Sequence, residues 1–225
     1  MNFTIGASIL VHIAAVFYVA GFLVKDQLIL RGLIFMGTLC YLSYYYFALD
    51  EPLWDAFIWS VIMGAANLFI IVQLAWERTT LGMSEADKAL YTVFDTMRPG
   101  EFRKLMKLAT RKQVGVTTTL VAEGVPVKDL YYVMDGGIEI AKGAHSFRIE
   151  PGTFIGEVGY FLNQSASATV RLDGGGSYVS WDGTSLRQLQ KKSPAIRAAL
   201  HSTLNVDMAR KVAQSGRNVS LAPQT

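Results

Sequence analysis

The sequence contains little cysteine, little histidine and little excess charge. Cys40 is the only cysteine among 225 residues, which excludes a disulfide framework and a cysteine-based metal site. His145 and His201 are isolated from each other, and no serine or cysteine stands beside a base in a recognisable nucleophile motif. The net charge of +3 is too small for the clustered basic surface that nucleic acid requires. We therefore expect no enzyme, no cofactor or metal, and no nucleic-acid partner.

Charged residues are also scarce before Trp76, where three long apolar runs follow one another. The runs are Phe3–Val24, Leu28–Leu49 and Leu53–Trp76. Each would reach about 30 Å or more as a helix, which is enough to cross a bilayer. The first run lacks the basic n-region of a secretory signal, so we expect it to be retained. The sequence predicts a three-helix transmembrane domain over residues 1–77.

The charges at the ends of these runs favour one orientation. Lys25 and Arg31 flank the first connection, acidic residues flank the second, and basic residues dominate after Arg78. Because cytoplasmic loops carry an excess of lysine and arginine, the N-terminus is expected outside and the second half of the chain in the cytoplasm. We expect a multi-pass protein of a plasma membrane or a bacterial inner membrane. The acidic residues are Asp50, Glu51 and Asp55.

Few polar side chains interrupt the apolar runs. His12, Asn67 and Gln73 are not distributed as an ion or proton pathway would need, so they indicate hydrogen bonds between helices rather than transport. Ser60 and Gly64, four residues apart, form a small-residue strip on which helices can approach closely. This strip gives weak support to a homo-oligomer, which we expect.

Residues 78–112 are predicted to form a helical lead-in to the second half of the chain. Leu90, Val93 and Phe94 recur at helical spacing, and Pro99-Gly100 marks a break. The polar side of this segment is basic. Contact with anionic membrane lipid and simple solvation explain that basic side about equally well.

Short segments of β type follow over residues 113–182, each bounded by glycine, proline or aspartate. This regular punctuation predicts a small antiparallel barrel or roll. Asp135-Gly136-Gly137 indicates a hairpin turn, because glycine supplies the positive φ of a tight turn, and Gly143-Ala144 indicates the next turn. The predicted strands are Gln113–Val121, Leu130–Met134, Ile138–Lys142, His145–Ile149, Thr169–Leu172 and Tyr178–Trp181.

The chain is expected to return to helix over residues 183–214. A helical apolar spacing resumes at Leu186, and Ser193 fits an N-cap followed by Pro194 at the first helical position. Residues 215–225 are expected to form a tail. The predicted fold class is therefore membrane α plus α+β, with three transmembrane helices followed by a β-roll flanked by helices.

Helix, eight-stranded roll and C-terminal helix form the plan of cyclic-nucleotide-binding domains, and two segments resemble theirs. Leu130–Ile140 resembles the central hairpin of that family. Ile155–Phe161, followed by Ala168-Thr169-Val170, resembles its phosphate-binding cassette, a short helix between two strands. With three preceding spans and Tyr178-Val179-Ser180-Trp181, the chain resembles the Popeye-domain family of membrane cAMP effectors. Its cassette departs from the Popeye Asp-Ser-Pro-Glu type and is closer to the Gly-Glu form of the general domain.

The resemblance implies a ligand and a site for it. Backbone N–H groups at the start of the cassette helix suit a cyclic phosphate, Gly156 lets the backbone approach it, and Glu157 suits the ribose 2′-hydroxyl as an acceptor. We expect cAMP first and cGMP second, since Ser167 lies where some relatives place a hydroxyl that favours guanine. The alternative is a structural turn and a helix-capping carboxylate in a domain that binds nothing. The implied ligand-binding residues are Ile155, Gly156, Glu157, Val158, Gly159, Ser167, Ala168 and Thr169.

Ala166 stands where the general family has an arginine that pairs with the cyclic phosphate. Losing this charge-assisted partner weakens binding by roughly thirty-fold to several thousand-fold. Arg148 and Arg171 are the nearest basic residues in the sequence that could reach the site. We expect an effector that acts through contacts with an unidentified membrane or cytoplasmic protein. The alternative is a ligand-free membrane scaffold in which the roll and the helix over 194–213 form a protein interface between two subunits.

Overall fold

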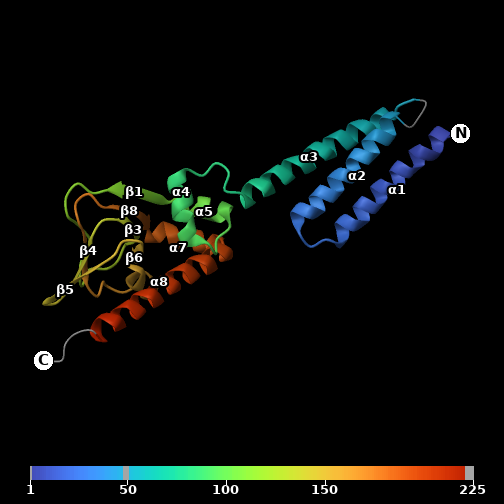
Figure 1. Cartoon of the computed structure of the whole chain (residues 1–225). Helices are drawn as coiled ribbons and strands as arrows, with labels where there is room; N and C mark the ends of the chain where they lie inside the picture. Colours follow the sequence, from blue (N-terminus) through green and yellow to red (C-terminus); the bar gives the residue numbers. More distant parts are fainter. Residues whose placement is uncertain (1, 48–50, 221–225) are drawn as a thin grey trace. The chain divides into compact units, whose positions relative to one another are not determined.

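The computed structural model describes the backbone of residues 2–47 and 51–220 and the side chains of residues 9–47 and 51–213. The chain forms two compact units, Met1–Leu81 and Gly82–Thr225. The first unit consists of helices, and the second is a β-structure with helices around it (Figure 1). Leu49 and Asp50, which we assigned to the second span and the second connection, lie outside the described residues.

The first unit is built from the helices α1 (Asn2–Leu23), α2 (Gln27–Phe47) and α3 (Trp54–Arg78). By length and composition, α2 and α3 are able to cross a membrane. The apolar part of α1 whose side chains are described, Ile9–Leu23, is only about 22 Å long, which is shorter than the hydrocarbon core. The described residues therefore give two candidate spans where we expected three.

Small residues let α2 pack closely against both neighbouring helices. A Cβ atom at Gly37 would lie 3.1 Å from the carbonyl oxygen of Ala14 on α1. A Cβ atom at Gly64 on α3 would lie 3.4 Å from Cγ2 of Thr38. Gly64 is buried in this packing, so this residue of the small-residue strip serves a contact within the chain, and self-association stays a prediction.

One of the three polar side chains predicted to bond between helices does so. Nδ2 of Asn67 donates to the carbonyl oxygen of Arg31 at 2.9 Å, which joins α3 to α2. His12 and Gln73 are exposed on the surface of the unit instead. His12 on α1 and Gln73 on α3 lie on faces of their helices that do not pack against the other helices. A single sequence does not reveal which face of a helix packs.

Asp26 fastens the end of α3 to the connection between α1 and α2. Its Oδ1 accepts the N–H of Leu28 at 2.8 Å and so caps α2, while its Oδ2 accepts from Nη1 of Arg78 at 2.9 Å. The hydrogen bond from Arg78 holds the pKa of Asp26 below its usual value. The basic residue Arg78 and its partner Asp26 therefore lie at the end of the unit that holds the connection between α1 and α2.

The second unit begins with short helices and continues with eight strands in two antiparallel sheets. The helical lead-in holds α4 (Glu85–Tyr91), a 3-10 turn (Thr92–Phe94) and α5 (Pro99–Met106). The strands are β1 (Ala109–Gln113), β2 (Thr118–Val121), β3 (Asp129–Asp135), β4 (Ile138–Lys142), β5 (His145–Ile149), β6 (Thr153–Ile155), β7 (Thr169–Leu172) and β8 (Ser177–Asp182). Their orders are β1-β8-β3-β6 and β2-β7-β4-β5, which confirms the eight-stranded roll with flanking helices.

The helical lead-in ends earlier than predicted, because β1 begins at Ala109 and not after residue 112. Ala109 lies opposite Trp181 in the antiparallel pair of β1 and β8. The indole N–H of Trp181 also donates to the carbonyl oxygen of Leu105, at 3.1 Å, where α5 is ending. Pairing with a strand some seventy residues later in the chain therefore overrides the local helical pattern.

Two predictions about strand connections were wrong. Asp135-Gly136-Gly137 does not close a hairpin, because β3 and β4 belong to different sheets. The predicted strand Gln113–Val121 is in fact β1 and β2, which also belong to different sheets. Gly143-Ala144 does form a hairpin turn, with Lys142 opposite His145 in the pair of β4 and β5. Turn residues mark where the chain reverses but not which strands then pair.

The unit closes with α7 (Gly183–Lys192) and α8 (Pro194–Ser220), and α8 lies alongside the strands of the roll (Figure 1). α8 continues past residue 214, where we expected a tail, because no proline interrupts the sequence before Pro223. One apolar cluster joins the helices to the outer side of the first sheet, and a second fills the roll. The first includes Phe94, Phe102, Phe154, Trp181, Ile196, Leu200 and Leu204, and the second includes Val133, Ile138, Ile155 and Leu172.

Candidate functional site

The predicted cassette consists of a strand, a single glycine and a short helix. β6 leads into Gly156, and α6 (Glu157–Leu162) begins at the next residue. Gly156 has a φ of +86°, a conformation that other residues rarely adopt. A Cβ atom at this position would also lie 3.1 Å from the carbonyl oxygen of Asp129. The backbone at position 156 therefore requires glycine.

The loop of residues 122–128, between β2 and β3, packs against the cassette. A Cβ atom at Gly159 would collide with the side chain of Val127 and lie 2.9 Å from the carbonyl oxygen of Gln164. Gly159 therefore provides room for close packing between α6 and this loop. Val158, the residue before Gly159, is 45% exposed.

The same loop also holds the second part of the predicted site. The N–H of Ala166 donates to the carbonyl oxygen of Val125 at 2.9 Å. The N–H of Glu123 donates to Oγ1 of Thr169 at 3.0 Å. Ser167, between these two bonds, is exposed. The loop thus brings the two predicted parts, which lie about ten residues apart in the sequence, into one region.

Neither of the two nearest arginines replaces the side chain that Ala166 lacks. Arg171 lies on the exposed face of β7, with its Nη1 3.6 Å from Oε2 of Glu139. Nη1 of Arg148 lies 2.9 Å from Oδ2 of Asp173. Both guanidinium groups are engaged on the outer surface of the second sheet. Our suggestion that one of them reaches the cassette is therefore wrong for this structure.

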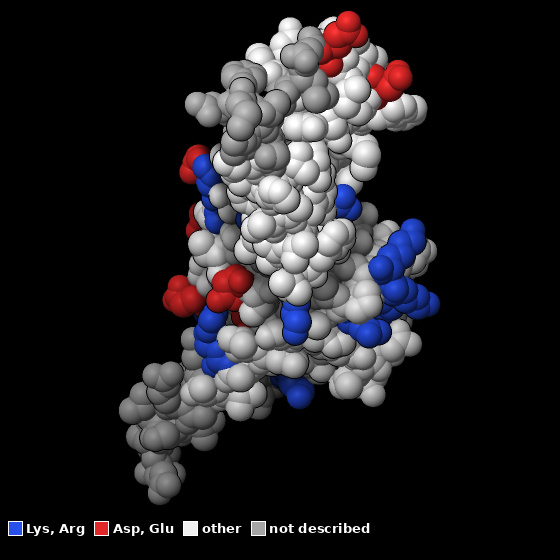
Figure 2. Space-filling model, turned by 90° about the vertical axis from the view of Figure 1, so that its right-hand side faces the viewer, with Lys and Arg blue, Asp and Glu red and all other residues white. Residues whose placement is uncertain are grey.

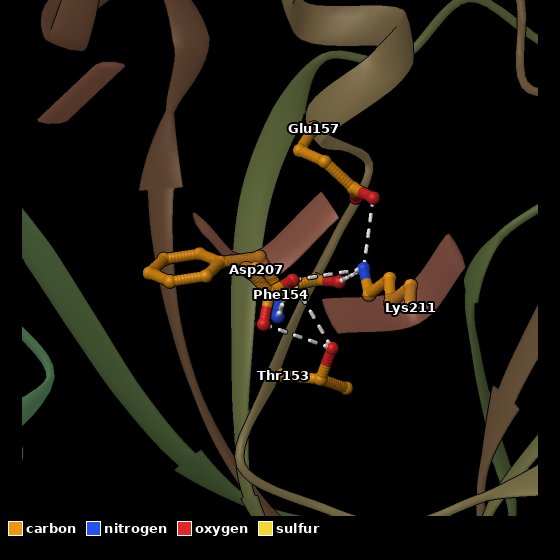
Figure 3. Close-up of polar contacts among 5 residues, drawn as sticks. All are labelled: Thr153, Phe154, Glu157, Asp207 and Lys211. Carbon is orange, nitrogen blue, oxygen red and sulfur yellow. Dashed lines mark hydrogen bonds and ion pairs between the residues drawn. The ribbon is translucent and has the colours of Figure 1, made fainter. Parts of the chain in front are cut away.

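The carboxylate of Glu157 is buried and paired with α8. Its side chain is 9% exposed, and its Oε1 lies 2.8 Å from Nζ of Lys211 (Figure 3). Nζ of Lys211 also lies 3.1 Å from Oδ2 of Asp207 and donates to the carbonyl oxygen of Phe154. The three N–H bonds of the ammonium group thus have three acceptors. The acceptor that we predicted for a ribose is engaged by the protein itself.

Asp207 and Lys211 together cover the free edge of β6, which is the last strand of its sheet. The N–H of Phe154 donates to Oδ2 of Asp207 at 3.2 Å, and its carbonyl oxygen accepts from Lys211. The hydroxyl of Thr153 donates to the same carboxylate at 3.2 Å (Figure 3). Edge N–H and C=O groups need partners, and here two residues one helical turn apart supply them.

Sequence reasoning missed both of these α8 residues. Asp207 and Lys211 are four positions apart, so they lie on one face of a helix. This spacing was the only sign in the sequence that the two side chains act together. Nothing in that spacing says that the face meets a strand about fifty residues earlier. The cluster of Glu157, Asp207 and Lys211 holds two carboxylates and one ammonium group, so it has no spare positive charge for an anionic ligand.

Further contacts tie α6 to the C-terminal helices. The guanidinium carbon of Arg187 on α7 lies 4.8 Å from the ring centre of Tyr160. Burial raises the pKa of the Tyr160 hydroxyl, and the nearby Arg187 opposes this rise. The rings of Phe161 and His201 meet edge to face with their centres 4.9 Å apart, which adds a contact with α8. Within the described residues, no three histidine, cysteine or acidic side chains gather as a metal site would require.

Two comparisons of the sequence with known proteins give matches. The sequence model of the family described as POPDC1-3 matches residues 7–217. A curated protein, the putative potassium channel protein of Rhodopseudomonas palustris, is 24% identical over 133 residues. This match covers 57% of the present chain and 31% of the channel protein, so the chain spans about a third of that relative's length.

Solved structures share the fold of the second unit. A putative cyclic nucleotide-binding protein from Geobacter metallireducens matches with a TM-score of 0.51 and 14% identity, over 58% of this chain and 99% of that one. A cyclic nucleotide-binding domain from Methylobacillus flagellatus matches with a TM-score of 0.54 and 16% identity, over 62% of this chain and 87% of that one. At such identities the likeness shows the fold alone.

Proposed function

The chain belongs to the POPDC1-3, or Popeye-domain, family, and on this premise we propose that it is a membrane-anchored receptor for a cyclic nucleotide. Two proteins that share its fold are described as binding cyclic nucleotides. The observation that carries the proposal is the cassette, in which an obligatory glycine at 156 precedes a buried carboxylate at 157. This Gly-Glu pair lies between the strand β6 and the helix α6, as the resemblance to cyclic-nucleotide-binding domains implied.

The proposed ligand is cAMP, with cGMP second. In this proposal Glu157 accepts the ribose 2′-hydroxyl, and the backbone of residues 155–159 and 167–169 borders the nucleotide. Ser167 is exposed, so its hydroxyl is free of the packing that holds Thr169 and is available to a base. Because Ala166 supplies no cation, we expect an affinity in the high micromolar to millimolar range, roughly thirty-fold or more below that of a site with the arginine.

The first unit is proposed as a three-helix membrane anchor, with α1 as the additional span. Only 11% of the apolar window of α2 and of α3 is buried inside the protein, so these helices are not the core of a soluble domain. Large apolar side chains of α1 are exposed too, with Phe22 at 75%. On the face that Figure 2 shows, the described residues of this unit are nearly all uncharged between its ends.

The proposed orientation has the N-terminus outside and the second unit in the cytoplasm of a cell with a plasma or inner membrane. Lys25, Arg31 and Arg78 gather at one end of the helices, whereas Glu51 and Asp55 lie at the other. The positive-inside rule assigns the basic end to the cytoplasm. The second unit follows directly after that end.

We propose that the protein acts through contacts with another protein and not by catalysis. Ligand at the cassette would alter the contacts of α6 with α7 and α8, which run through Tyr160 and Phe161. The downstream partner is a membrane or cytoplasmic protein. Self-association of the chain stays a prediction, and chemical crosslinking of the full chain in detergent tests it directly.

A ligand-free membrane scaffold is the second candidate, and the polar contacts of the cassette favour it. Ala166 lacks a charge, and Arg148 and Arg171 are paired on the second sheet. Oε1 of Glu157 is already paired with Lys211. In this reading the Glu157 carboxylate has a structural role only. The roll and α8 would then serve as a fixed surface for assembly.

Calorimetry and nucleotide-dependent melting of the full chain in detergent distinguish the two candidates. We expect binding of cAMP and, more weakly, of cGMP, with Glu157→Ala weakening it and Gly156→Asp abolishing it. Glu150→Ala is the matched control, because Glu150 is an exposed acidic residue just before β6. No response to either nucleotide at millimolar concentration would remove the receptor proposal and favour the scaffold.

A further inference from the structure

We propose that the guanidinium group of Arg31, oriented by Asn67, binds the phosphate group of an anionic phospholipid in the cytoplasmic leaflet. Arg31 is the only charged residue within α2. The inference rests on the proposed membrane anchor and its orientation, and it does not depend on the nucleotide. It assigns a ligand class to a charged side chain that an apolar helix would otherwise not contain.

Arg31 lies inside the apolar part of the first unit, beyond its polar end. The pair of Asp26 and Arg78 marks that end, and Arg31 follows Asp26 by five residues, which corresponds to about 8 Å along a helix. The Arg31 side chain is partly buried. Hydrocarbon offers no acceptors, so an arginine near the end of a span extends toward the headgroups to find them. The phosphate groups of the leaflet are therefore within its reach.

The protein supplies one acceptor for this guanidinium, and that acceptor is neutral. Nη1 of Arg31 donates to Oδ1 of Asn67 at 3.4 Å. The amide of Asn67 is 6% exposed and is held in place because its Nδ2 donates to the carbonyl oxygen of Arg31. A guanidinium has five N–H donors, so a single amide oxygen leaves most of them to other partners.

No carboxylate contacts the Arg31 guanidinium within residues 9–47 and 51–213. Asp26 is the nearest acidic residue in the sequence, but its Oδ2 accepts from Arg78 and its Oδ1 accepts the backbone N–H groups of Leu28 and Ile29. The described part of the chain thus orients Arg31 without neutralising its charge. A negative group from outside the chain fits this arrangement.

The chemistry of the group favours a phosphate. The planar fork of a guanidinium matches two phosphate oxygens, and basic sites between membrane helices on the cytoplasmic side bind lipid headgroups. The surface of α2 beside Arg31 is open, because a Cβ atom at Gly32 would have nothing within 4 Å. Basic residues outnumber acidic residues at this end, which favours an anionic over a zwitterionic headgroup. The basic residues are Lys25, Arg31 and Arg78, and the acidic residues are Asp26 and Glu77.

Native mass spectrometry of the full chain in detergent tests this site with equal amounts of phosphatidylglycerol and phosphatidylcholine. At high ionic strength, which screens exposed charges, the unmodified chain should retain phosphatidylglycerol roughly five-fold more than phosphatidylcholine. Arg31→Gln should abolish this preference. Lys25→Gln is the matched control, because Lys25 is an exposed basic residue at the same end, and its preference should stay within about two-fold of the unmodified chain. Equal losses in the two variants would overturn the site and indicate diffuse attraction.

Asn67→Asp keeps the inference testable if Arg31→Gln does not insert into the membrane. It places a carboxylate at the position of the amide that meets Arg31, so the arginine gains an internal counter-charge and the preference for phosphatidylglycerol should vanish. A preference that persists in Asn67→Asp would overturn the site. Displacement of phosphatidylglycerol by millimolar glycerol 3-phosphate would also overturn it, because the site would then take soluble phosphates.

Flotation with vesicles of phosphatidylcholine separates this inference from the anchor on which it rests. If the chain floats with the vesicles but shows no preference for phosphatidylglycerol, the lipid site is wrong and the anchor stands. If the chain does not float with the vesicles, both are wrong.

Discussion

The carboxylate of Asp207 accepts the backbone N–H of Phe154 at 3.2 Å and takes the place of a neighbouring strand at the edge of β6. The same carboxylate accepts the hydroxyl of Thr153 and lies 3.1 Å from Nζ of Lys211. A helix thus closes the edge of a sheet through side chains, and it does so at the strand that leads into the cassette. This arrangement fixes the position of Gly156 and Glu157 relative to α8.

The first prediction concerns the stability that Asp207 provides. Asp207→Ala leaves the N–H of Phe154, the hydroxyl of Thr153 and the charge of Lys211 without their partner, so we expect a loss of about 2 to 4 kcal/mol in the free energy of unfolding. Asp207→Asn keeps an acceptor oxygen and should lose less. Chemical denaturation of the full chain measures both, with Asn205→Ala as the exposed control on the same helix. Equal stabilities of Asp207→Ala and Asn205→Ala would contradict this role.

The second prediction concerns the packing of Gly159 against Val127. Gly159→Ala places a methyl group into the Val127 side chain and should destabilise the protein by about 1 to 3 kcal/mol. Val127→Ala in the same chain should restore part of that loss, which a double-mutant cycle measures. Gly115→Ala is the control, because a Cβ atom there has open space around it. Purely additive effects of the two substitutions would show that the side chains do not meet.

The third prediction concerns alkaline pH. Burial, followed by the nearby Asp129 carboxylate, raises the pKa of Tyr131 from 10 to about 12. Between pH 10 and pH 12 the unfolded chain loses this proton while the folded chain keeps the hydroxyl protonated, so stability falls as the pH rises through that range. Tyr131→Phe removes this contribution and should flatten the fall, as denaturation at stepped pH values would record. An unchanged slope would show that Tyr131 titrates normally.

The fourth prediction concerns the number of membrane spans. In a Cys40→Ala background, single cysteines at Thr4, Glu51 and Lys142 are labelled from either side of the membrane with an impermeant maleimide. If α1 crosses, Thr4 and Lys142 react from opposite sides, and Glu51 reacts from the same side as Thr4. If Thr4 and Lys142 react from the same side, α1 does not cross and the anchor has two spans.

Much of the fold follows from local signals in the sequence. Ser193 and Pro194 predicted the start of α8, and Oγ of Ser193 does accept the N–H of Ile196 at 3.4 Å. Gly143-Ala144 predicted a hairpin that exists, because the turn and its two strands are adjacent in the chain. The α2 and α3 helices were predicted from apolar length alone.

What the sequence did not reveal depends on contacts between distant segments. Asp135-Gly136-Gly137 has the same local signal as a hairpin, yet its strands enter two different sheets, because β3 pairs with β6 and β8 whereas β4 pairs with β5 and β7. The partnership of Glu157 with Lys211 joins residues 54 positions apart, and no local pattern specifies it. Ala166 was visible in the sequence as a missing charge, but only the fold shows that Arg148 and Arg171 do not compensate for it.

Restoring the missing charge at position 166 tests nucleotide binding at the cassette directly. Titration of the full chain and of Ala166→Arg with cAMP by calorimetry compares the site with and without a cation at that position. If the cassette binds the nucleotide in the proposed place, Ala166→Arg tightens cAMP binding by roughly thirty-fold or more. Adding Glu157→Ala should weaken the binding of cAMP to both proteins, because the ribose 2′-hydroxyl then loses its acceptor. No binding of cAMP by Ala166→Arg at millimolar concentration would contradict a nucleotide site at the cassette.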